Sequence, residues 1–180
     1  MTFTPRPLPA TAQQLCEKLA ATSRLVAHLT LVHDAAVELA EGLRLRFPTL
    51  KLDGGAVLFG AATHDLGKVL HPGELTGPGN RHEADGPVLL ERNGISPELA
   101  RFARTHGAWS TEMLPLEDLL VALADCVWKG QRLEALEAQV VASIAEKIGG
   151  EQWDVFDKLD GLLEEVAAHG DERLAWQQKC

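Results

Sequence analysis

The stretch GAATHDLGKVL, residues 60–70, places a His-Asp pair at the end of an apolar segment. A helix turns by about 100° per residue, so residues four or seven apart lie on the same face. On such a helix Asp65 continues the apolar face of Ala61, and His64 continues that of Val57. A carboxylate that faces the core costs free energy unless a positive charge or hydrogen-bond donors compensate it. A metal ion would compensate it, and the pair is therefore a candidate metal site.

The rest of the chain is predicted to be helical. Period-two alternation of apolar and polar residues is scarce, which argues against a sheet. Asp53 and Ser96 are suited to begin helices as N-caps, and the Gly- and Pro-rich stretch 71–81 is suited to a loop. We therefore predict an all-α fold, a helical bundle. The expected helices begin at about residue 11, cover about 22–46, 53–65, 82–92, 96–105 and 116–129, and are followed by two or three more.

Size and composition suit a single soluble domain. The chain has 180 residues, of which 46% are hydrophobic and 24% charged, as in ordinary globular proteins. Its net charge of −9 argues against a binder of duplex nucleic acid, which would present a basic face. No apolar run reaches the roughly 20 residues of a membrane span, and the N-terminus lacks a signal-peptide pattern. We therefore expect a cytoplasmic protein with no membrane partner.

A second His-Asp pair, His33–Asp34, lies in the helix expected over residues 22–46. The apolar face of that helix repeats at spacings of four and three, through Leu25, Leu29, Val32, Ala36, Leu39 and Leu43. His28 lies at the edge of this face, whereas Asp34 lies on the opposite side of the helix. We therefore predict that Asp34 is exposed and that His33–Asp34 is a solvated surface pair outside any site.

Asp125 is a third polar residue at a position predicted to be buried. The helix around it is apolar almost all round over residues 119–127, so its carboxylate needs a compensating partner. That partner is either a buried Arg or Lys, a set of hydroxyl groups, or a metal ion shared with His28, His64 and Asp65.

These blocks together resemble the HD superfamily of metal-dependent phosphohydrolases. The family pattern is a histidine on one helix, a His-Asp pair that ends another, and an aspartate on a later helix. RLVAHLTLVHDAAVELA resembles the first block and supplies His28, and LFGAATHDLGKVL resembles the second and supplies His64 and Asp65. LEDLLVALADCVWKGQR resembles the last block and supplies Asp125.

Two further histidines, His82 and His106, stand beside loops, where either one alone could be an ordinary surface residue. Their surroundings, RHEADGPVLL and ARTHGAWS, resemble the two additional histidine blocks of the dinuclear branches of the superfamily. The resemblance covers about residues 24–132 and implies that both histidines bind a second ion. The alternative is a mononuclear site that uses only the other four ligands.

The resemblance implies an HD domain, which we assign to residues 1–148, with a C-terminal helical extension over 149–180 packed on the same domain. It also implies hydrolysis of a phosphate ester or anhydride, and the expected substrate is a nucleotide or a dinucleotide polyphosphate. The expected partner is thus a small phosphorylated molecule, and a homodimer stays open as the assembly. The ligand set is similar to that of bacterial symmetrical diadenosine-tetraphosphate hydrolases, whereas the absence of tyrosine separates the chain from the cyclic-dinucleotide-cleaving branch. A non-catalytic HD module that binds a nucleotide or a protein partner in regulation stays open as an alternative.

Four histidines and two carboxylates suit Mn²⁺, Fe²⁺, Co²⁺, Ni²⁺ or Zn²⁺, with Mg²⁺ as a further candidate, and one or two ions are expected. If two ions bind, Asp65 is the natural bridge because a carboxylate has two oxygens. Asp65 and Lys68 are the expected catalytic residues. Lys68, Arg81 and Lys129 are the candidate cations for substrate phosphate, although Lys68 could instead be a helix C-terminal cation favoured by the helix dipole. The loop 71–81 is a candidate substrate-selecting lid, or a simple connector.

Overall fold

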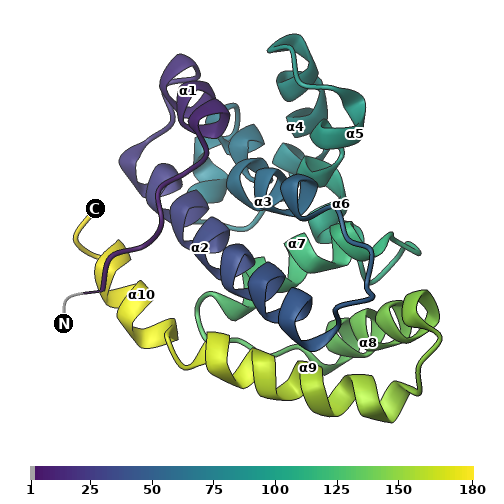
Figure 1. Ribbon diagram of the computed structural model, residues 1–180. Coiled ribbons are helices and arrows are strands. Elements are labelled where there is room, and N and C mark those ends of the chain that lie inside the picture. Colours follow the sequence, from purple (N-terminus) through teal and green to yellow (C-terminus); the bar gives the residue numbers. More distant parts are fainter. Residues whose placement is uncertain (1–2) are drawn as a thin grey trace.

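A computed structural model describes residues 3–180, and this part of the chain contains helices and no strand. The predicted all-α fold class is confirmed, and Figure 1 shows the helices packed around one another. The helices are α1 (Ala10–Lys18), α2 (Ser23–Arg46), α3 (Gly54–Thr63), α4 (Arg81–Arg92), α5 (Pro97–Ala100), α6 (Phe102–Ala108), α7 (Leu116–Val127), α8 (Glu134–Ile148), α9 (Gln152–Ala167) and α10 (Gly170–Gln177). Two short 3₁₀ helices, η1 (Leu66–Val69) and η2 (Pro72–Leu75), follow α3.

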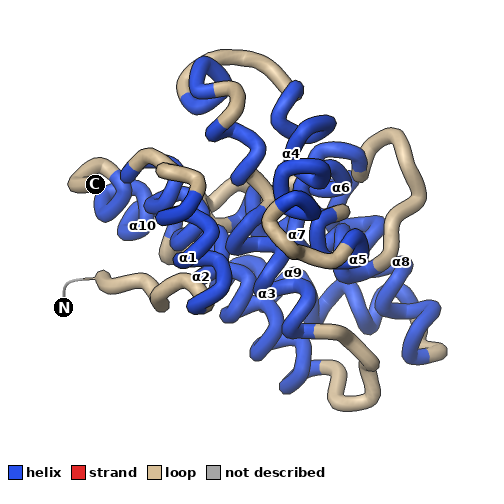
Figure 2. The backbone as a smooth tube through the Cα atoms, turned by 90° about the horizontal axis from the view of Figure 1, so that it is seen from above, coloured by secondary structure: helices blue, strands red, loops and turns tan. Residues whose placement is uncertain are grey.

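Helix α2 is the longest helix and packs against α3, α7, α9 and α10 (Figures 1 and 2). Leu31 and Leu39 of α2 and Leu120 and Leu123 of α7 are among the fully buried side chains of the main core. Each leucine removed from water in this way stabilises the fold by about 1.5–3 kcal/mol. The apolar face predicted for the segment 22–46 is therefore the face on which the bundle is built.

A smaller apolar cluster lies at the other end of the bundle. It joins α1 to the first turns of α2 and to parts of α3, α4 and α6, through residues such as Leu15, Leu25, Leu66, Leu90 and Ala103. Helices α2, α3 and α6 each contribute to both clusters. The predicted site residues His28 and His64 lie between residues of the smaller cluster in the sequence, and His106 lies one turn after Ala103 of that cluster.

Two glycines allow the helices around this border to approach closely. A Cβ atom at Gly60 would lie 2.6 Å from Phe102 and 2.8 Å from Val121, so only glycine lets α3 pack this tightly on α6 and α7. A Cβ atom at Gly67 would collide with the carbonyl oxygen of His82. Gly67 therefore holds η1 directly against α4, and brings the segment after Asp65 beside the histidine of α4.

The helix starts agree with the sequence in most places. Asp53 caps α3, because its side chain accepts a hydrogen bond from the amide of Ala56 at 2.9 Å. Ser96 precedes α5 but makes no capping hydrogen bond through its side chain. The single helix expected over 96–105 is instead two helices, α5 and α6, on either side of Arg101. The loop expected over 71–81 contains η2 and ends where α4 begins.

The prediction that Asp34 is exposed is wrong. Asp34 is only 2% exposed, and its Oδ2 accepts hydrogen bonds from Nε and Nη2 of Arg173 at 3.2 and 3.1 Å. Its Oδ1 accepts from the amide and Nη1 of Arg6, both at 3.0 Å. His33 is also buried. The polar side of α2 is covered by α10 and by the segment before α1, and the periodicity of α2 alone cannot reveal a cover supplied from elsewhere in the chain.

Helices α9 and α10 return along α2 (Figure 1). Val155, Leu159 and Leu162 of α9 belong to the main core, and Gly149 ends α8 in the left-handed conformation with φ 66°. The assignment of residues 1–148 and 149–180 as domain and extension stays a prediction. Within residues 3–180, no helix combines the length and the apolar character that crossing a membrane requires.

The buried pair of Asp34 and Arg173 gives a test of how α10 is held. Replacing Asp34 by Asn removes one of the two carboxylates that pair with the fully buried guanidinium of Arg173, the other being Glu38 at 2.9 Å. The change should lower the free energy of unfolding by about 2 kcal/mol, because a buried charge-assisted pair is lost while Glu38 keeps the guanidinium partly compensated. The matched change Asp157→Asn, at an exposed position of α9, should stay within about 0.5 kcal/mol. Urea unfolding followed by circular dichroism measures both, and equal effects would contradict the role assigned to the pair.

Candidate metal centre

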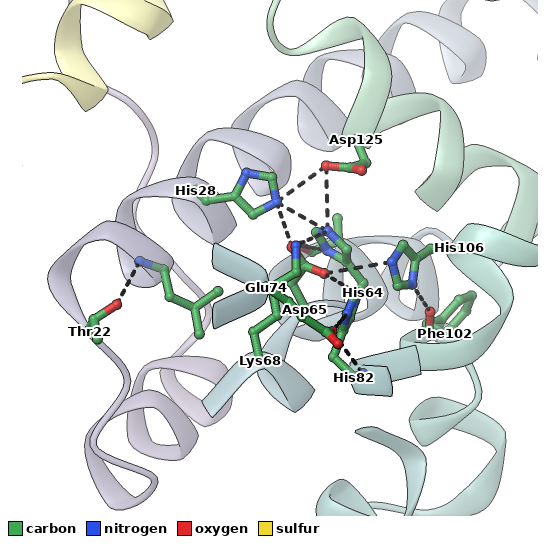
Figure 3. Close-up of polar contacts among 12 residues, drawn as sticks. Thr22, His28, His64, Asp65, Lys68, Glu74, His82, Phe102, His106 and Asp125 are labelled. Atoms are coloured by element: carbon green, nitrogen blue, oxygen red, sulfur yellow. Dashed lines mark hydrogen bonds and ion pairs between the residues drawn. The ribbon is translucent and has the colours of Figure 1, made fainter. Parts of the chain in front are cut away.

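The six side chains proposed from the sequence as metal ligands lie together in the structure (Figure 3). They come from five helices or helix ends, which the two apolar clusters hold in place. The contributions are His28 from α2, His64 and Asp65 from the end of α3, His82 from α4, His106 from α6 and Asp125 from α7.

One group of donor atoms surrounds the Nε2 atom of His28. This atom lies 3.1 Å from Asp65 Oδ2, 3.3 Å from His64 Nε2 and 3.3 Å from Asp125 Oδ1. His64 Nε2 lies 3.5 Å from Asp125 Oδ1 and 3.7 Å from Asp65 Oδ2. His28, His64 and Asp65 each offer a donor atom within 4.8 Å of the others. The four side chains thus point toward one common position.

A second group lies on the other side of the same carboxylate. The Oδ1 atom of Asp65 lies 3.1 Å from His82 Nε2 and 3.6 Å from His106 Nε2. These three residues also have donor atoms within 4.8 Å of one another. Asp65 therefore turns one oxygen toward each group, which is the arrangement that a carboxylate between two cations adopts.

In three of the imidazole rings, a hydrogen bond at Nδ1 determines that Nε2 is the nitrogen available as a metal ligand. Nδ1 of His64 donates to the carbonyl of Ala61 at 3.0 Å, and Nδ1 of His106 donates to the carbonyl of Phe102 at 3.1 Å. Nδ1 of His82 donates to a carboxylate oxygen of Glu74 at 2.6 Å. A neutral imidazole that donates through Nδ1 keeps a lone pair on Nε2. All three lone pairs then face the interior of the site, as metal ligands require.

Two buried polar atoms of the site have no hydrogen-bond partner. They are Oδ1 of Asp65 and Nε2 of His82, which lie 3.1 Å apart. When His82 is neutral and donates through Nδ1, both atoms are acceptors, so neither can donate to the other. Buried polar atoms are rarely left unsatisfied. A cation between the two groups would satisfy both atoms, so the residues present fit a divalent metal ion with imidazole and carboxylate ligands.

The surroundings of the site shift the pKa values of its histidines in opposite directions and lower those of its carboxylates. Burial alone would lower the pKa of His28, but its hydrogen bonds to Asp125 and Asp65 outweigh burial and raise the pKa to about 9. Burial, and beyond it the proximity of His64, lowers the pKa of His106 to about 4. Burial would raise the pKa of Asp65 and of Asp125, yet the neighbouring histidines hold both well below their usual value. Both carboxylates are therefore ionised over the whole physiological range.

The three cations proposed for substrate phosphate do not share one position. Lys68 places its Nζ atom 2.5 Å from Asp65 Oδ2, and Lys129 lines the same cavity of about 230 Å³ beside Asp65. Arg81 is exposed and is not among the residues that line this cavity, and its amide donates to Glu74 at 3.1 Å. Lys68 and Lys129 are therefore in reach of a bound phosphate, whereas the structure does not bring the Arg81 side chain there.

Glu74 is a residue of the site that the sequence analysis did not identify. It lies in η2 and accepts hydrogen bonds from Nδ1 of His82 at 2.6 Å and from the amide of the same residue at 3.2 Å. Burial would raise the pKa of Glu74, but these bonds outweigh it and lower the pKa to about 2. Its signal in the sequence is slight: Glu74 is the only Asp, Glu, Lys or Arg within residues 71–80. The candidate lid thus contains a carboxylate that orients a proposed ligand.

Comparison with protein families matched the family described as HD domain over residues 10–127. This segment is about two thirds of the chain and contains all six proposed ligands. Searches of curated proteins and of solved structures found no match.

The raised pKa of His28 predicts that metal binding releases a proton. At pH 7 the ring of His28, with a pKa of about 9, is charged and must lose its proton to become a ligand, whereas His106, with a pKa of about 4, is already neutral. Affinity for Mn²⁺ should therefore rise about ten-fold per pH unit and level off near pH 9. Burial would lower the pKa of His82, but its hydrogen bonds to Asp65 and Glu74 outweigh burial and raise it above its usual value, so His82 also releases a proton when it binds metal. Calorimetry in two buffers that differ in ionisation enthalpy should therefore show between one and two protons released per chain at pH 7, and one fewer in a His28→Ala variant. The same release from a His28→Ala variant would contradict this assignment.

Glu74 gives a second test, because it holds His82 in place without itself facing the cation positions. Glu74→Gln should weaken metal binding by about 10–100-fold, the usual cost of losing a carboxylate that orients a ligand histidine. Glu91→Gln, an exposed change on α4, is the matched control and should leave affinity unchanged. Competition with a chelating dye measures both variants.

Proposed function

The chain belongs to the HD domain family, and from this premise we propose that it hydrolyses a phosphate ester or anhydride of a nucleotide or dinucleotide polyphosphate. Members of the family are in general metal-dependent phosphohydrolases, and the clustered histidines and aspartates could hold a metal ion. The observation that carries the proposal is the position of Asp65, whose two oxygens face two different pairs of histidines. A structural helical bundle has no need for such a carboxylate, since its burial is costly.

The ligands divide naturally into two sets that share Asp65. His28, His64 and Asp125 complete one set, and His82 and His106 complete the other. Mn²⁺, Fe²⁺, Co²⁺, Ni²⁺ and Zn²⁺ suit such nitrogen-rich sets, and Mg²⁺ suits them less. Bound ions of this kind supply Lewis acidity, which polarises a phosphoryl group and makes water a better nucleophile near neutral pH.

The chain itself supplies orientation and charge. Lys68 shares Asp65 Oδ2 with His28, and its flexible side chain can turn from that oxygen to a phosphoryl oxygen of the substrate. A cation fixed at this point stabilises the negative charge that develops during phosphoryl transfer. Asp65 stays ionised because its neighbours hold its pKa low, so it can also accept a hydrogen bond from an attacking water. These are the roles proposed for the two catalytic residues.

The shape of the site favours recognition of phosphate over recognition of a base. The cavity beside Asp65 has a volume of about 230 Å³, below the roughly 300–1,000 Å³ of pockets that enclose a whole ligand. Trp128 lines this cavity but is only 4% exposed, with its ring 5.5 Å from that of His28. The ring therefore supports His28 and offers no open face for stacking. A nucleoside would lie largely outside the cavity, with its phosphates inside.

Metal content and hydrolysis together test the proposal. The wild-type protein loaded with Mn²⁺ or Co²⁺ should contain two ions per chain by mass spectrometry and should hydrolyse members of a nucleotide panel. His82→Ala and His106→Ala should each lose about one ion per chain, and Asp65→Asn should lower the hydrolytic rate by at least about 100-fold. His169→Ala, a change at an exposed histidine outside the site, is the control.

Two results would contradict parts of this assignment. Unchanged metal content and rate in both His82→Ala and His106→Ala would exclude the second ion and leave a mononuclear site. Tight binding of metal and nucleotide without hydrolysis of any panel member would favour the regulatory module over the enzyme.

A further inference from the structure

The cavity beside Asp65 is formed by parts of the chain that are far apart in the sequence. Besides the site residues His28 and Lys68, it is lined by Arg24 from the first turn of α2, by Lys129 just after α7, and by Gln177 at the end of α10. Arg24 and Gln177 have no place in the metal centre described above. They are therefore the residues whose presence at the cavity needs another explanation.

The helical register places two of these side chains one turn away from proposed ligands. Arg24 is four residues before His28 on α2, and Lys129 is four residues after Asp125. Trp128, between α7 and Lys129, keeps helical backbone angles of −57° and −29°. Four residues correspond to about 6 Å along a helix and lie on the same face. The two cations thus flank the cavity about one helical turn beyond the ligands.

The charges at this end of the cavity are not neutralised by the protein. Lys68 forms an ion pair with Asp65, but neither Arg24 nor Lys129 has an acidic partner within 4.0 Å among residues 3–180. The chain as a whole has a net charge of −9. Two unpaired cations beside one small cavity therefore make a locally positive site on a protein of negative net charge. Such a pair attracts an anion and lowers the cost of bringing a highly charged substrate to the site.

Helix α10 is held at the cavity by contacts that fix its position. Arg173, four residues before Gln177, is fully buried and paired with Asp34 of α2 at 3.1 Å. The hydroxyl of Ser23 donates to the carbonyl of Cys180 at 3.0 Å. Figure 1 shows α10 beside the first half of α2. The amide of Gln177 can then act as a fixed hydrogen-bond donor, from a segment outside the matched residues 10–127.

We propose that Arg24, Lys129 and Gln177 form a subsite for a second phosphate group of the substrate. Arg and Lys are the side chains best suited to bind phosphate oxygens, and their position one turn from the ligands places a second phosphate beside the one at the metal centre. The inference rests on the proposed function and narrows it: the protein selects substrates with at least two phosphate groups over monophosphates. Helix α10 is then a specificity element as well as a structural one.

Binding of methylenediphosphonate and of inorganic phosphate to the Mn²⁺-loaded protein, measured by calorimetry, tests the subsite without requiring turnover. In the double variant Arg24→Gln/Lys129→Gln, affinity for methylenediphosphonate should fall about 100-fold, or about ten-fold for each lost charge-assisted contact. Affinity for phosphate should fall much less, by at most about ten-fold, because, of the two cations, only Lys129 is placed in reach of a phosphate at the metal centre. Gln177→Ala should weaken only the diphosphonate, by about three- to ten-fold.

The matched control is Arg92→Gln/Lys147→Gln, which removes the same charge at exposed positions away from the cavity and should change neither affinity. Metal content and thermal unfolding of each variant are measured alongside. Arg24 and Lys129 are exposed, so the double variant should change neither property, whereas for the half-buried Gln177 the unfolding curve shows whether Gln177→Ala has altered α10. An equal loss of affinity for both probes, or no loss for either, would overturn the subsite. Preference for the diphosphonate in a protein that hydrolyses no phosphate compound would support the subsite and reject the hydrolase. Hydrolysis with the same KM for ADP and AMP in wild type and double variant would overturn the subsite alone.

Discussion

A single buried carboxylate organises this protein. Asp65 is 2% exposed, and four imidazoles and one ammonium group lie within 3.7 Å of its two oxygens. Isolation of that charge from water is tolerable only because His64, His28 and His82, and any bound cation, favour the ionised form. The helices that carry them must therefore meet at one point. The apolar packing of the bundle holds these helices around Asp65.

The close approach of the helices depends on small residues rather than on additional polar contacts. Gly60 lets α3 lie against α6 and α7, and Gly67 lets η1 lie against α4. A side chain at either position would push a proposed ligand away from Asp65. The same compactness removes much of the site from water, and this burial lowers the pKa of His106, whereas at His28 the hydrogen bonds to Asp125 and Asp65 outweigh burial and raise the pKa.

The polar side of α2 carries a second buried carboxylate that holds distant segments together. Asp34 was expected to be solvated, but Arg6 and Arg173 bury it beneath the N-terminal segment and α10. A buried ion pair contributes little net stability, yet it fixes the geometry of the elements it joins because either charge alone would be costly. At this position it fixes α10, and through α10 the side chain of Gln177 at the cavity. The second His-Asp pair is thus structural, although its structural role differs from the predicted one.

The sequence by itself determined the all-α class, the approximate helix boundaries and the inward direction of His64 and Asp65, because helical periodicity is a local property of the chain. It also pointed to His28, His82, His106 and Asp125 through a resemblance spread over five blocks. Only the tertiary structure decided that Asp34 is covered, that Glu74 orients His82, and that Arg24 and Gln177 line the same cavity as Lys68. Each of these facts depends on which distant segment covers a given face, and no periodicity within one helix contains that information.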